Sequence, residues 1–304
     1  TATIPTLNLR RASESSKADT RKFLFELPHG GEVESVQMRY AEEMGPGRVA
    51  VCISSQVGCA MGCSFCASGV MGLKRHLSTW EIVDQVTQIQ NAIRDKGERV
   101  ANVVFMGLGE PLHNFDEVLR AVHLLNLADG LGIGKRHLTI STSGLVPQIL
   151  QLAETGLPIR LAISLHAVRD ELRSEIMPVN QRYNIATLLE ACGVYYGKTG
   201  RRITFEYVLL AGVNDSDAHA RRLVALLAPV RAKVNLIPFN EAAGLPFARP
   251  SEPRIDAFAA ILAARGVTVS VRKSRGRDIR AACGQLIVEG GARSPAQRMA
   301  SLMT

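Results

Sequence analysis

Residues 49–66 read VAVCISSQVGCAMGCSFC, a β-rich run that leads directly into a loop with three closely spaced cysteines. Four of the six cysteines in the 304-residue chain lie between Cys52 and Cys66. Buried core cysteines do not cluster in this way, and clustered thiols in a reducing compartment are more often metal ligands than disulfides. The stretch therefore predicts a metal-binding loop at the end of a β-strand.

Helix and strand patterns alternate along the chain after this loop. A helix begins at Ser78 or Thr79, and the apolar periodicity predicts five more near 115–128, 146–155, 184–196, 215–229 and 252–265. Strands are expected at 49–53, 102–106, 136–141, 158–164, 203–210, 233–238 and 267–271. These are six β-then-α units and a seventh strand. Each helix must return the chain to the same edge direction, so the alternation requires a mostly parallel sheet with right-handed crossovers.

Polar or glycine-rich segments follow the carboxyl ends of the predicted strands. After the cysteine loop they are GLGEP at 107–111, STSG at 141–144, SLH at 164–166 and PFN at 238–240. In a parallel barrel those strand ends share one rim. We therefore expect an α/β fold of the partial (β/α)6 TIM-like barrel type. A short N-terminal β-hairpin should precede it, because Val36, Met38 and Tyr40 alternate before a turn at 45–47.

The composition fits one globular barrel with short extensions. Apolar residues make up 46% of the chain, and 26 glycines with 13 prolines are an ordinary content, which excludes collagen-like and low-complexity chains. No apolar run approaches a membrane span and no signal peptide is evident, so a cytoplasmic protein without membrane contact is expected. We expect a flexible basic arm over residues 1–22, the barrel with its hairpin over 23–290, and a C-terminal tail over 291–304.

The charge balance is basic. Lys and Arg number 36 against 28 Asp and Glu, a formal net charge of +8. Such a balance is typical of proteins that meet polyanions. Five of the basic residues are concentrated in one short run: Arg272, Lys273, Arg275, Arg277 and Arg280. This run favours phosphate contacts, with a solvated surface as the alternative.

The cysteine loop has the spacing C-x3-C-x2-C, with Cys59, Cys63 and Cys66. Three thiolates can occupy three corners of a cuboidal iron–sulfur cluster and leave the fourth iron open. A structural zinc site would need a fourth ligand, and the nearest histidine, His76, is not at the usual spacing. An iron–sulfur cluster is the favoured interpretation, and a zinc-stabilised nucleic-acid-binding module without catalysis is the alternative.

Seven ordered motifs resemble those of the radical S-adenosylmethionine (SAM) RNA adenine methyltransferases of the RlmN/Cfr type. They are SSQVGCAMGCSFCASG (54–69), MGLGEPLHN (106–114), LTISTSGLVP (138–147), LAISLHA (161–167), ITFEYVLLAGVND (203–215), VNLIPFN (234–240), and VRKSRG (271–276) with CGQL (283–286). The resemblance extends from about Lys22 to Leu286. The family usually carries an N-terminal accessory domain, and only about 22 arm-like residues are expected before the barrel here. Either the sequence is a truncated piece, or the protein is a divergent relative with a different or smaller substrate.

The resemblance implies a role for individual residues. Cys59, Cys63 and Cys66 would ligate a [4Fe-4S] cluster. Gly109 and Glu110 would hold the amino group of SAM, and the rest of SAM would be contacted by Ser141, Ser164, Leu165, His166 and Asn240. Taken singly, Gly109–Pro111 also fits a simple turn and His166 a structural histidine; the shared rim favours the binding roles.

The resemblance also implies a catalytic pair of thiols. Cys283 would accept a methyl group from one SAM, and a 5′-deoxyadenosyl radical from a second SAM would activate that methyl group for addition to adenine. Cys52 would then release the adduct by forming a disulfide, and Glu34 would accept a proton. For Glu34 a solvated hairpin carboxylate is the alternative. Cys192 continues an apolar helical face and is predicted to lie in the core.

The expected activity is methylation of an adenine ring carbon in rRNA, tRNA or both, through an S-methylcysteine intermediate, with carbon 2 favoured over carbon 8. An electron donor such as flavodoxin or ferredoxin would serve the cluster. The same chemistry on a small adenine-containing nucleotide is the alternative, because the accessory domain is missing.

Overall fold

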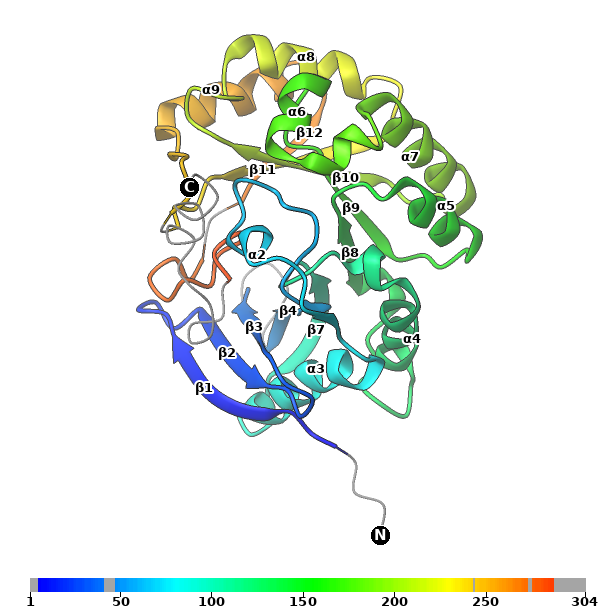
Figure 1. The fold of residues 1–304 in the computed structure, drawn as a ribbon, viewed down its shortest axis with the longest axis vertical. Helices are drawn as coiled ribbons and strands as arrows, with labels where there is room; N and C mark the ends of the chain where they lie inside the picture. Colours follow the sequence, from blue (N-terminus) through cyan, green and yellow to red (C-terminus); the bar gives the residue numbers. More distant parts are fainter. Residues whose placement is uncertain (1–4, 41–46, 243, 273–274, 287–304) are drawn as a thin grey trace, which may run out of the picture.

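The computed structural model describes residues 5–40, 47–242, 244–272 and 275–286. Ten strands form one sheet in the order β1-β2-β3-β4-β7-β8-β9-β10-β11-β12 (Figure 1). Their bounds are β1 Asn8–Glu14, β2 Thr20–Glu26, β3 Glu32–Arg39, β4 Arg48–Cys52, β7 Arg99–Phe105, β8 Leu138–Thr142, β9 Arg160–Ser164, β10 Ile203–Leu209, β11 Ala232–Pro238 and β12 Thr268–Val271. A separate small sheet pairs β5 (Gln56–Val57) with β6 (Arg75–His76).

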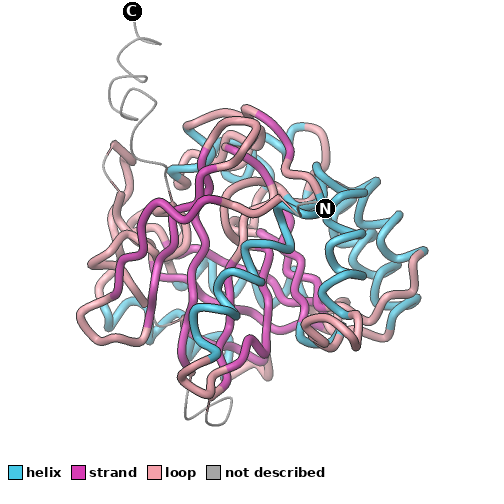
Figure 2. The backbone as a smooth tube through the Cα atoms, turned by 90° about the horizontal axis from the view of Figure 1, so that it is seen from below, coloured by secondary structure: helices cyan, strands magenta, loops and turns pink. Residues whose placement is uncertain are grey.

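The seven strands from β4 to β12 are parallel and form the predicted partial barrel. The connecting helices are α3 Thr79–Arg94, α4 Phe115–Asn126, α5 Val146–Glu154, α6 Asp170–Ile176, α7 Ile185–Thr199, α8 Asp217–Leu227 and α9 Glu252–Ala263. Figure 2 shows the strands as a curved wall with helices along its outer side. Within the described residues, β1 and β12 are the two edges of the sheet, so the barrel is open.

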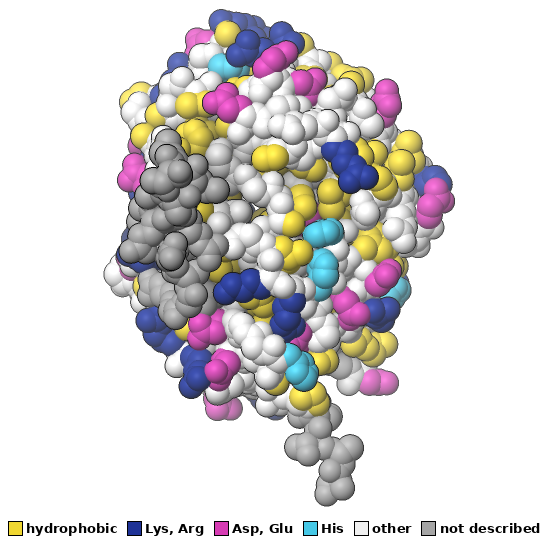
Figure 3. Space-filling model, in the orientation of Figure 1, with side chains coloured by type: hydrophobic (Ala, Val, Ile, Leu, Met, Phe, Trp, Pro, Cys, Tyr) yellow, Lys and Arg dark blue, Asp and Glu magenta, His cyan; other side chains and the backbone are white. Residues whose placement is uncertain are grey.

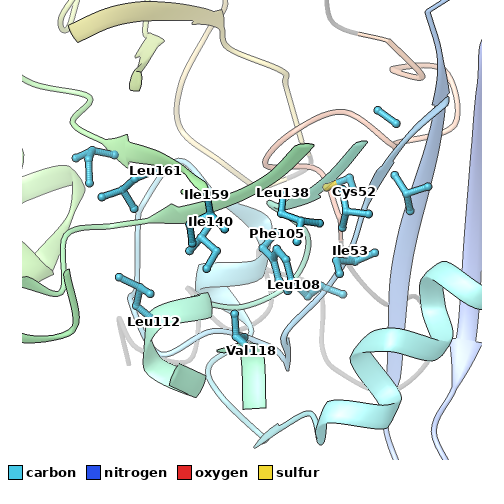
Figure 4. Packing of buried hydrophobic residues seen from close by; sticks show 14 of the residues in the cluster. Cys52, Ile53, Phe105, Leu108, Leu112, Val118, Leu138, Ile140, Ile159 and Leu161 are labelled. Carbon is cyan, nitrogen blue, oxygen red and sulfur yellow. The ribbon is translucent and has the colours of Figure 1, made fainter. Parts of the chain in front are cut away.

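The core lies between this wall and the helices. Along α3 the buried positions Ile82, Val86, Ile89 and Ile93 recur at helical spacing and face the sheet. Figure 4 shows side chains of neighbouring strands, among them Phe105 of β7, converging in this layer. Burial of this continuous apolar surface is the main force that holds the parallel strands together.

The helix boundaries follow local capping chemistry. Ser78 and Glu81 form a capping box at the start of α3, with the Ser78 amide donating to Glu81 Oε2 over 2.8 Å. The predicted start of the helix near 215 is slightly early, because Ser216 is the N-cap of α8 and Asn214 is fully buried in the preceding turn. The sequence did not predict α6, whose seven residues are too few for a clear periodicity.

The N-terminal region differs from the flexible arm predicted over residues 1–22. Residues 8–14 form β1, which pairs antiparallel with β2, and β2 pairs antiparallel with β3. A polar edge strand has the same kind of sequence as a flexible arm. Its side chains face solvent, and only its backbone pairs with the neighbouring strand. The hairpin of β3 with β4 is as predicted, with Val36 opposite Cys52. The predicted tail at 291–304 lies outside the described residues.

The segment 275–286 packs against these antiparallel strands. Arg275 Nη1 lies 3.2 Å from Asp19 Oδ2, and its guanidinium stacks over the Tyr40 ring at 4.4 Å. The Ser16 amide donates to Asp278 over 2.7 Å. These contacts hold the segment that carries Cys283 against the open side of the barrel. No helix in the described part of the chain has the length and apolarity needed to cross a membrane.

Candidate active site

A cavity lies at the carboxyl ends of the parallel strands, where the sequence predicted a common rim. Ten of the predicted site residues, from six separate segments of the chain, line it: Cys59, Cys63, Cys66, Gly109, Glu110, Ser141, Ser164, His166, Asn240 and Cys283. On the face drawn in Figure 3, hydrophobic and histidine side chains gather near the centre. The fold thus brings together residues that are more than 200 positions apart in the chain.

The three cysteines of the loop after β5 form a buried donor set, and the Arg173 guanidinium lowers the pKa of one of them, Cys63. Burial raises the pKa of Cys59 to about 12 and raises that of Cys63 and Cys66, and the thiols raise one another's pKa further. A positively charged iron–sulfur core would offset this penalty, so the residues fit such a cluster. Within the described residues, no three His, Cys, Asp or Glu side chains are placed so that they could hold a single metal ion.

The turn at Gly109 and Glu110 is built around Gln56. Gly109 has a φ of +105°, and a Cβ there would lie 2.6 Å from Cβ of Gln56. Gln56 Oε1 accepts from the Glu110 amide over 2.8 Å. The Glu110 carboxylate accepts from the amides of Leu112 (3.1 Å) and Ser143 (2.7 Å). Burial raises the pKa of Glu110. A bound ammonium group, such as that of SAM, would stabilise the ionised form.

Two buried oxygens at the cavity lack a partner within the described residues. They are Oδ1 of Asn240 and Oγ of Ser143. The side-chain amide of Asn240 is oriented by its Nδ2, which donates to the Cys283 carbonyl over 3.2 Å. Buried polar atoms without partners are rare in folded proteins, so both oxygens fit contacts to a polar ligand. Ser143 was not predicted, although the STSG motif contains it.

His166 contributes a neutral imidazole to the cavity. Its Nδ1 accepts from the Val208 amide over 3.0 Å, which places the proton on Nε2. Burial lowers the pKa of His166 to about 3. Its backbone has a φ of +59° and its ring packs edge-on against Phe65. The neighbouring Leu165 does not line the cavity: its side chain is fully buried in the main core.

Arg173 of α6 was missed in the sequence and supports two strand ends. Its buried guanidinium donates to the carbonyls of Leu165 (3.0 Å), Ser164 (3.0 Å) and Ser143 (2.7 Å) and to Asn180 Oδ1 (2.9 Å). Burial lowers its pKa to about 10. Arg173 therefore ties the carboxyl ends of β8 and β9 together beneath the cavity. Sequence reasoning had no signal for it, because α6 itself was not predicted.

The two thiols predicted to be catalytic lie together. Cys52 and Cys283 line a second, smaller cavity with Arg272, and Cys283 lines both cavities. Burial, followed by the proximity of Cys283, raises the pKa of Cys52 to about 12, while Arg272 lowers it. Both are free thiols in the structure. Cys192 is fully buried in α7, as predicted.

Glu34 is buried beside this region and does not line either cavity. It forms an ion pair with Lys22 at 2.8 Å, and the Lys22 ammonium also lies 3.4 Å from the Arg280 carbonyl. Its own carbonyl accepts from Ser54 Oγ over 2.7 Å. Glu34 is thus not the solvated hairpin carboxylate that was the alternative.

The residues of the basic run that the sequence predicted to contact phosphate differ in their contacts and exposure. Arg275 is engaged by Asp19 and Tyr40, whereas Arg277 and Arg280 are exposed. Lys273 lies outside the described residues. On the face shown in Figure 3, basic and acidic side chains are interspersed rather than arranged in one stripe.

Comparisons with known proteins agree with this geometry. The model of the radical SAM superfamily matches residues 53–224. A probable dual-specificity RNA methyltransferase RlmN from Desulforamulus reducens is 52% identical over 90% of this chain and 75% of its own length. The dual-specificity RNA methyltransferase RlmN of Anaeromyxobacter dehalogenans is 48% identical over 97% of this chain and 80% of its own.

A solved structure also shares the fold. The crystal structure of a radical SAM methyltransferase from Sphaerobacter thermophilus superposes with a TM-score of 0.88 at 49% identity, covering 92% of this chain and 81% of that one.

Proposed function

Because this chain belongs to the radical SAM superfamily and, within it, to the RlmN family of RNA methyltransferases, we propose that it methylates a ring carbon of adenine in rRNA, tRNA or both. It is an enzyme whose cofactors are a [4Fe-4S] cluster and SAM. The names of the relatives favour RNA over a small nucleotide as substrate. Carbon 2 is favoured over carbon 8, and the reaction passes through S-methylcysteine at Cys283.

One observation carries the proposal: the three loop cysteines, the Glu110 carboxylate and Cys283 line the same cavity. Cys59, Cys63 and Cys66 would hold the cluster, and Gly109 with Glu110 would hold the SAM amino group. Ser141, Ser164, His166 and Asn240 would position the remainder of SAM. When bound, the cluster supplies an electron and SAM supplies both the methyl group and the radical.

The thiol pair answers a chemical problem. The C–H carbons of adenine are electrophilic, so they do not attack the methyl group of SAM directly. A methyl group carried on Cys283 and activated as a radical adds to the ring instead, which joins RNA to protein. The adduct must then lose one electron to the oxidised cofactor and its ring proton to a base. Cys52 attacks Sγ of Cys283, so that the S–S bond forms while the S–C bond breaks with its electron pair on carbon; that carbon takes up a proton and becomes the methyl group of the freed base. The two thiols share a cavity, as this exchange requires.

Glu34 is proposed as the acceptor of the proton that leaves the adenine carbon. The family motif around Glu34 supports this role; in the structure the carboxylate is paired with Lys22 at 2.8 Å and lines neither cavity, so the role requires a rearrangement when RNA binds. The exposed Arg277 and Arg280 are proposed phosphate contacts beside the reacting thiol. A cytoplasmic location and a one-electron donor such as flavodoxin or ferredoxin complete the proposal.

Mass spectrometry of Cys283 tests this function. The protein is reconstituted anaerobically with iron and sulfide and incubated with SAM and reductant, and the peptide that contains Cys283 is analysed. We expect one added methyl group on Cys283 and none in Cys283→Ala. An unmethylated Cys283 would contradict the mechanism.

Nucleoside analysis of rRNA fragments, tRNA and free adenine nucleotides after turnover then identifies the substrate. Methylation of RNA is expected. Turnover on the free nucleotide alone would contradict the RNA assignment.

A further inference from the structure

The methyl transfer to Cys283 releases a proton, and no residue discussed so far receives it. The thiol Sγ forms a bond to the methyl carbon while the bond from that carbon to the sulfonium of SAM breaks. The electron pair of the broken bond stays on the departing sulfur, giving S-adenosylhomocysteine. The thiol hydrogen must leave as a proton, and a nearby base would accelerate the step.

Most proton-accepting groups around Cys283 are already engaged. The Glu110 carboxylate accepts from two backbone amides, and the Nδ1 of His166 accepts from the Val208 amide. Cys52 stays protonated because burial raises its pKa to about 12. Glu34 lines neither cavity. In the described part of the chain, the other carboxylate that lines the main cavity is Glu206 of β10.

Glu206 is held at the centre of a polar row across four parallel strands. The sheet register places it between Ser164 of β9 and Asn235 of β11, and Asn235 lies next to Ser270 of β12. Ser270 Oγ donates to Asn235 Oδ1 over 3.0 Å, and Asn235 Nδ2 donates to Glu206 Oε2 over 2.7 Å. Because Oδ1 is occupied, the Asn235 amide has a fixed orientation with its donor toward Glu206.

In this arrangement Oε1 of Glu206 accepts no hydrogen bond from the described residues. Among the described residues, Asn235 supplies the hydrogen bond that the Glu206 side chain accepts, and it goes to Oε2. The side chain lines the cavity that Cys283 also lines. Arg272 interacts electrostatically with both Cys283 and Glu206, so one guanidinium lies within reach of both groups. This cation favours the ionised form of the Glu206 carboxylate.

We propose that Glu206 is a further catalytic residue, the base that takes the thiol proton of Cys283 as the methyl group is transferred. This inference rests on the proposed function. Burial raises the pKa of Glu206 above its ordinary value, and Arg272, Asn235 and Lys233 lower it. A carboxylate with a raised pKa is a stronger base than one in water and thus better suited to a thiol proton.

The test is the pH profile of Cys283 methylation in a single turnover. Charged and titratable groups that face Glu206 are Lys233 on β11, Arg272 after β12, and, across the cavity, His166, Glu110 and Cys283. In the wild type the rate should rise to a plateau as Glu206 ionises. The variant Glu206→Gln keeps the acceptor for Asn235 but has no base, so we expect methylation at neutral pH to slow by about 100-fold.

The shape of the profile separates catalysis from positioning. In Glu206→Gln the thiol proton must go to hydroxide, so the rate should climb with pH and approach the wild-type rate in alkali. An equal reduction at every pH would overturn the proposal, and so would full recovery at saturating SAM, which would assign Glu206 to SAM binding. Glu190→Gln, an exposed change on α7, should match the wild type.

A second variant keeps the proposal testable if Glu206→Gln does not fold. Asn235→Leu removes the hydrogen bond to Oε2, which stabilises the ionised carboxylate, so the ascending limb should move to higher pH. An unmoved limb would overturn the proposal. A wild-type protein that never methylates Cys283 would instead contradict the proposed function, so the two failures are distinguishable.

Discussion

The antiparallel and parallel parts of the same sheet use their buried polar side chains differently. In the antiparallel part, Lys22 of β2 pairs with Glu34 of β3 and also lies 3.4 Å from the carbonyl of Arg280, in the segment that carries Cys283. Gln37 of β3 has no partner for its buried amide among the described residues, but it lines neither cavity. In the parallel part, the unpartnered oxygens of Ser143 and Asn240 line the main cavity. A buried polar atom without a partner is available to a ligand where it lines a cavity. The antiparallel strands are therefore a support, and the parallel strand ends are the site.

The largest expected effect comes from the parallel part. Cys63→Ala removes one of three cluster ligands, so we expect loss of iron, of the visible absorbance and of all RNA methylation. Far-UV circular dichroism should be unchanged, because the barrel core does not depend on this loop. Cys192→Ala is the matched control, since it removes a buried thiol from α7 and should keep the iron. A Cys63→Ala protein with full iron content would show that the cluster lies elsewhere.

The next largest effect is on stability and comes from breaking the Lys22–Glu34 ion pair of the antiparallel part. Lys22→Met leaves the Glu34 carboxylate buried without its cation, and we expect a loss of about 3–5 kcal/mol in the free energy of unfolding. Urea denaturation measures this. The double variant Lys22→Met/Glu34→Leu replaces the pair by apolar side chains and should recover most of the stability.

Turnover of that double variant then tests the proposed role of Glu34. If Glu34 accepts the adenine proton, methylation stays low although stability has recovered. Turnover that recovered with stability would remove Glu34 from the mechanism.

A smaller effect concerns His166. Its folded-state pKa of about 3 is below the ordinary value near 6.5, so the unfolded chain binds a proton that the folded chain does not. The contribution of His166 to the free energy of unfolding is fully present above pH 6.5. It is lost as the pH falls, by about 2 kcal/mol between pH 6.5 and 5. His166→Asn, which tolerates the positive φ, should lose this part of the pH dependence in urea denaturation of the apoprotein. Identical pH dependences would show that His166 is not buried as a neutral ring.

The smallest effect is on SAM binding. Asn240→Ala removes one unpartnered oxygen from the cavity, and one hydrogen bond of about 1.4 kcal/mol corresponds to a tenfold weaker affinity for SAM. Isothermal titration calorimetry of the reconstituted protein measures it. Asn91→Ala on the exposed side of α3 should bind as the wild type does. Equal affinities of Asn240→Ala and wild type would place SAM away from Asn240.

The sequence predicted the elements of the barrel well and its N-terminal edge poorly. The β-then-α alternation is a local periodicity, and the predicted strand over 203–210 is observed at 203–209. The sequence predicts a flexible arm where residues 8–14 form a strand, because the exposed polar side chains of these residues have no alternating apolar pattern. Its stability comes from pairing with β2, which a local pattern does not reveal.

The sequence by itself determined the three-cysteine loop, the order of the seven parallel strands, and the motifs at the strand ends. Each depends on residues that are close in the chain. Only the tertiary structure decided that Glu34 pairs with Lys22, that Arg173 ties two strand ends together, and that Glu206 faces the cavity with Cys283. Those relations depend on the lateral register of strands that are distant in sequence, because the pairing of a strand decides which neighbours each buried side chain meets.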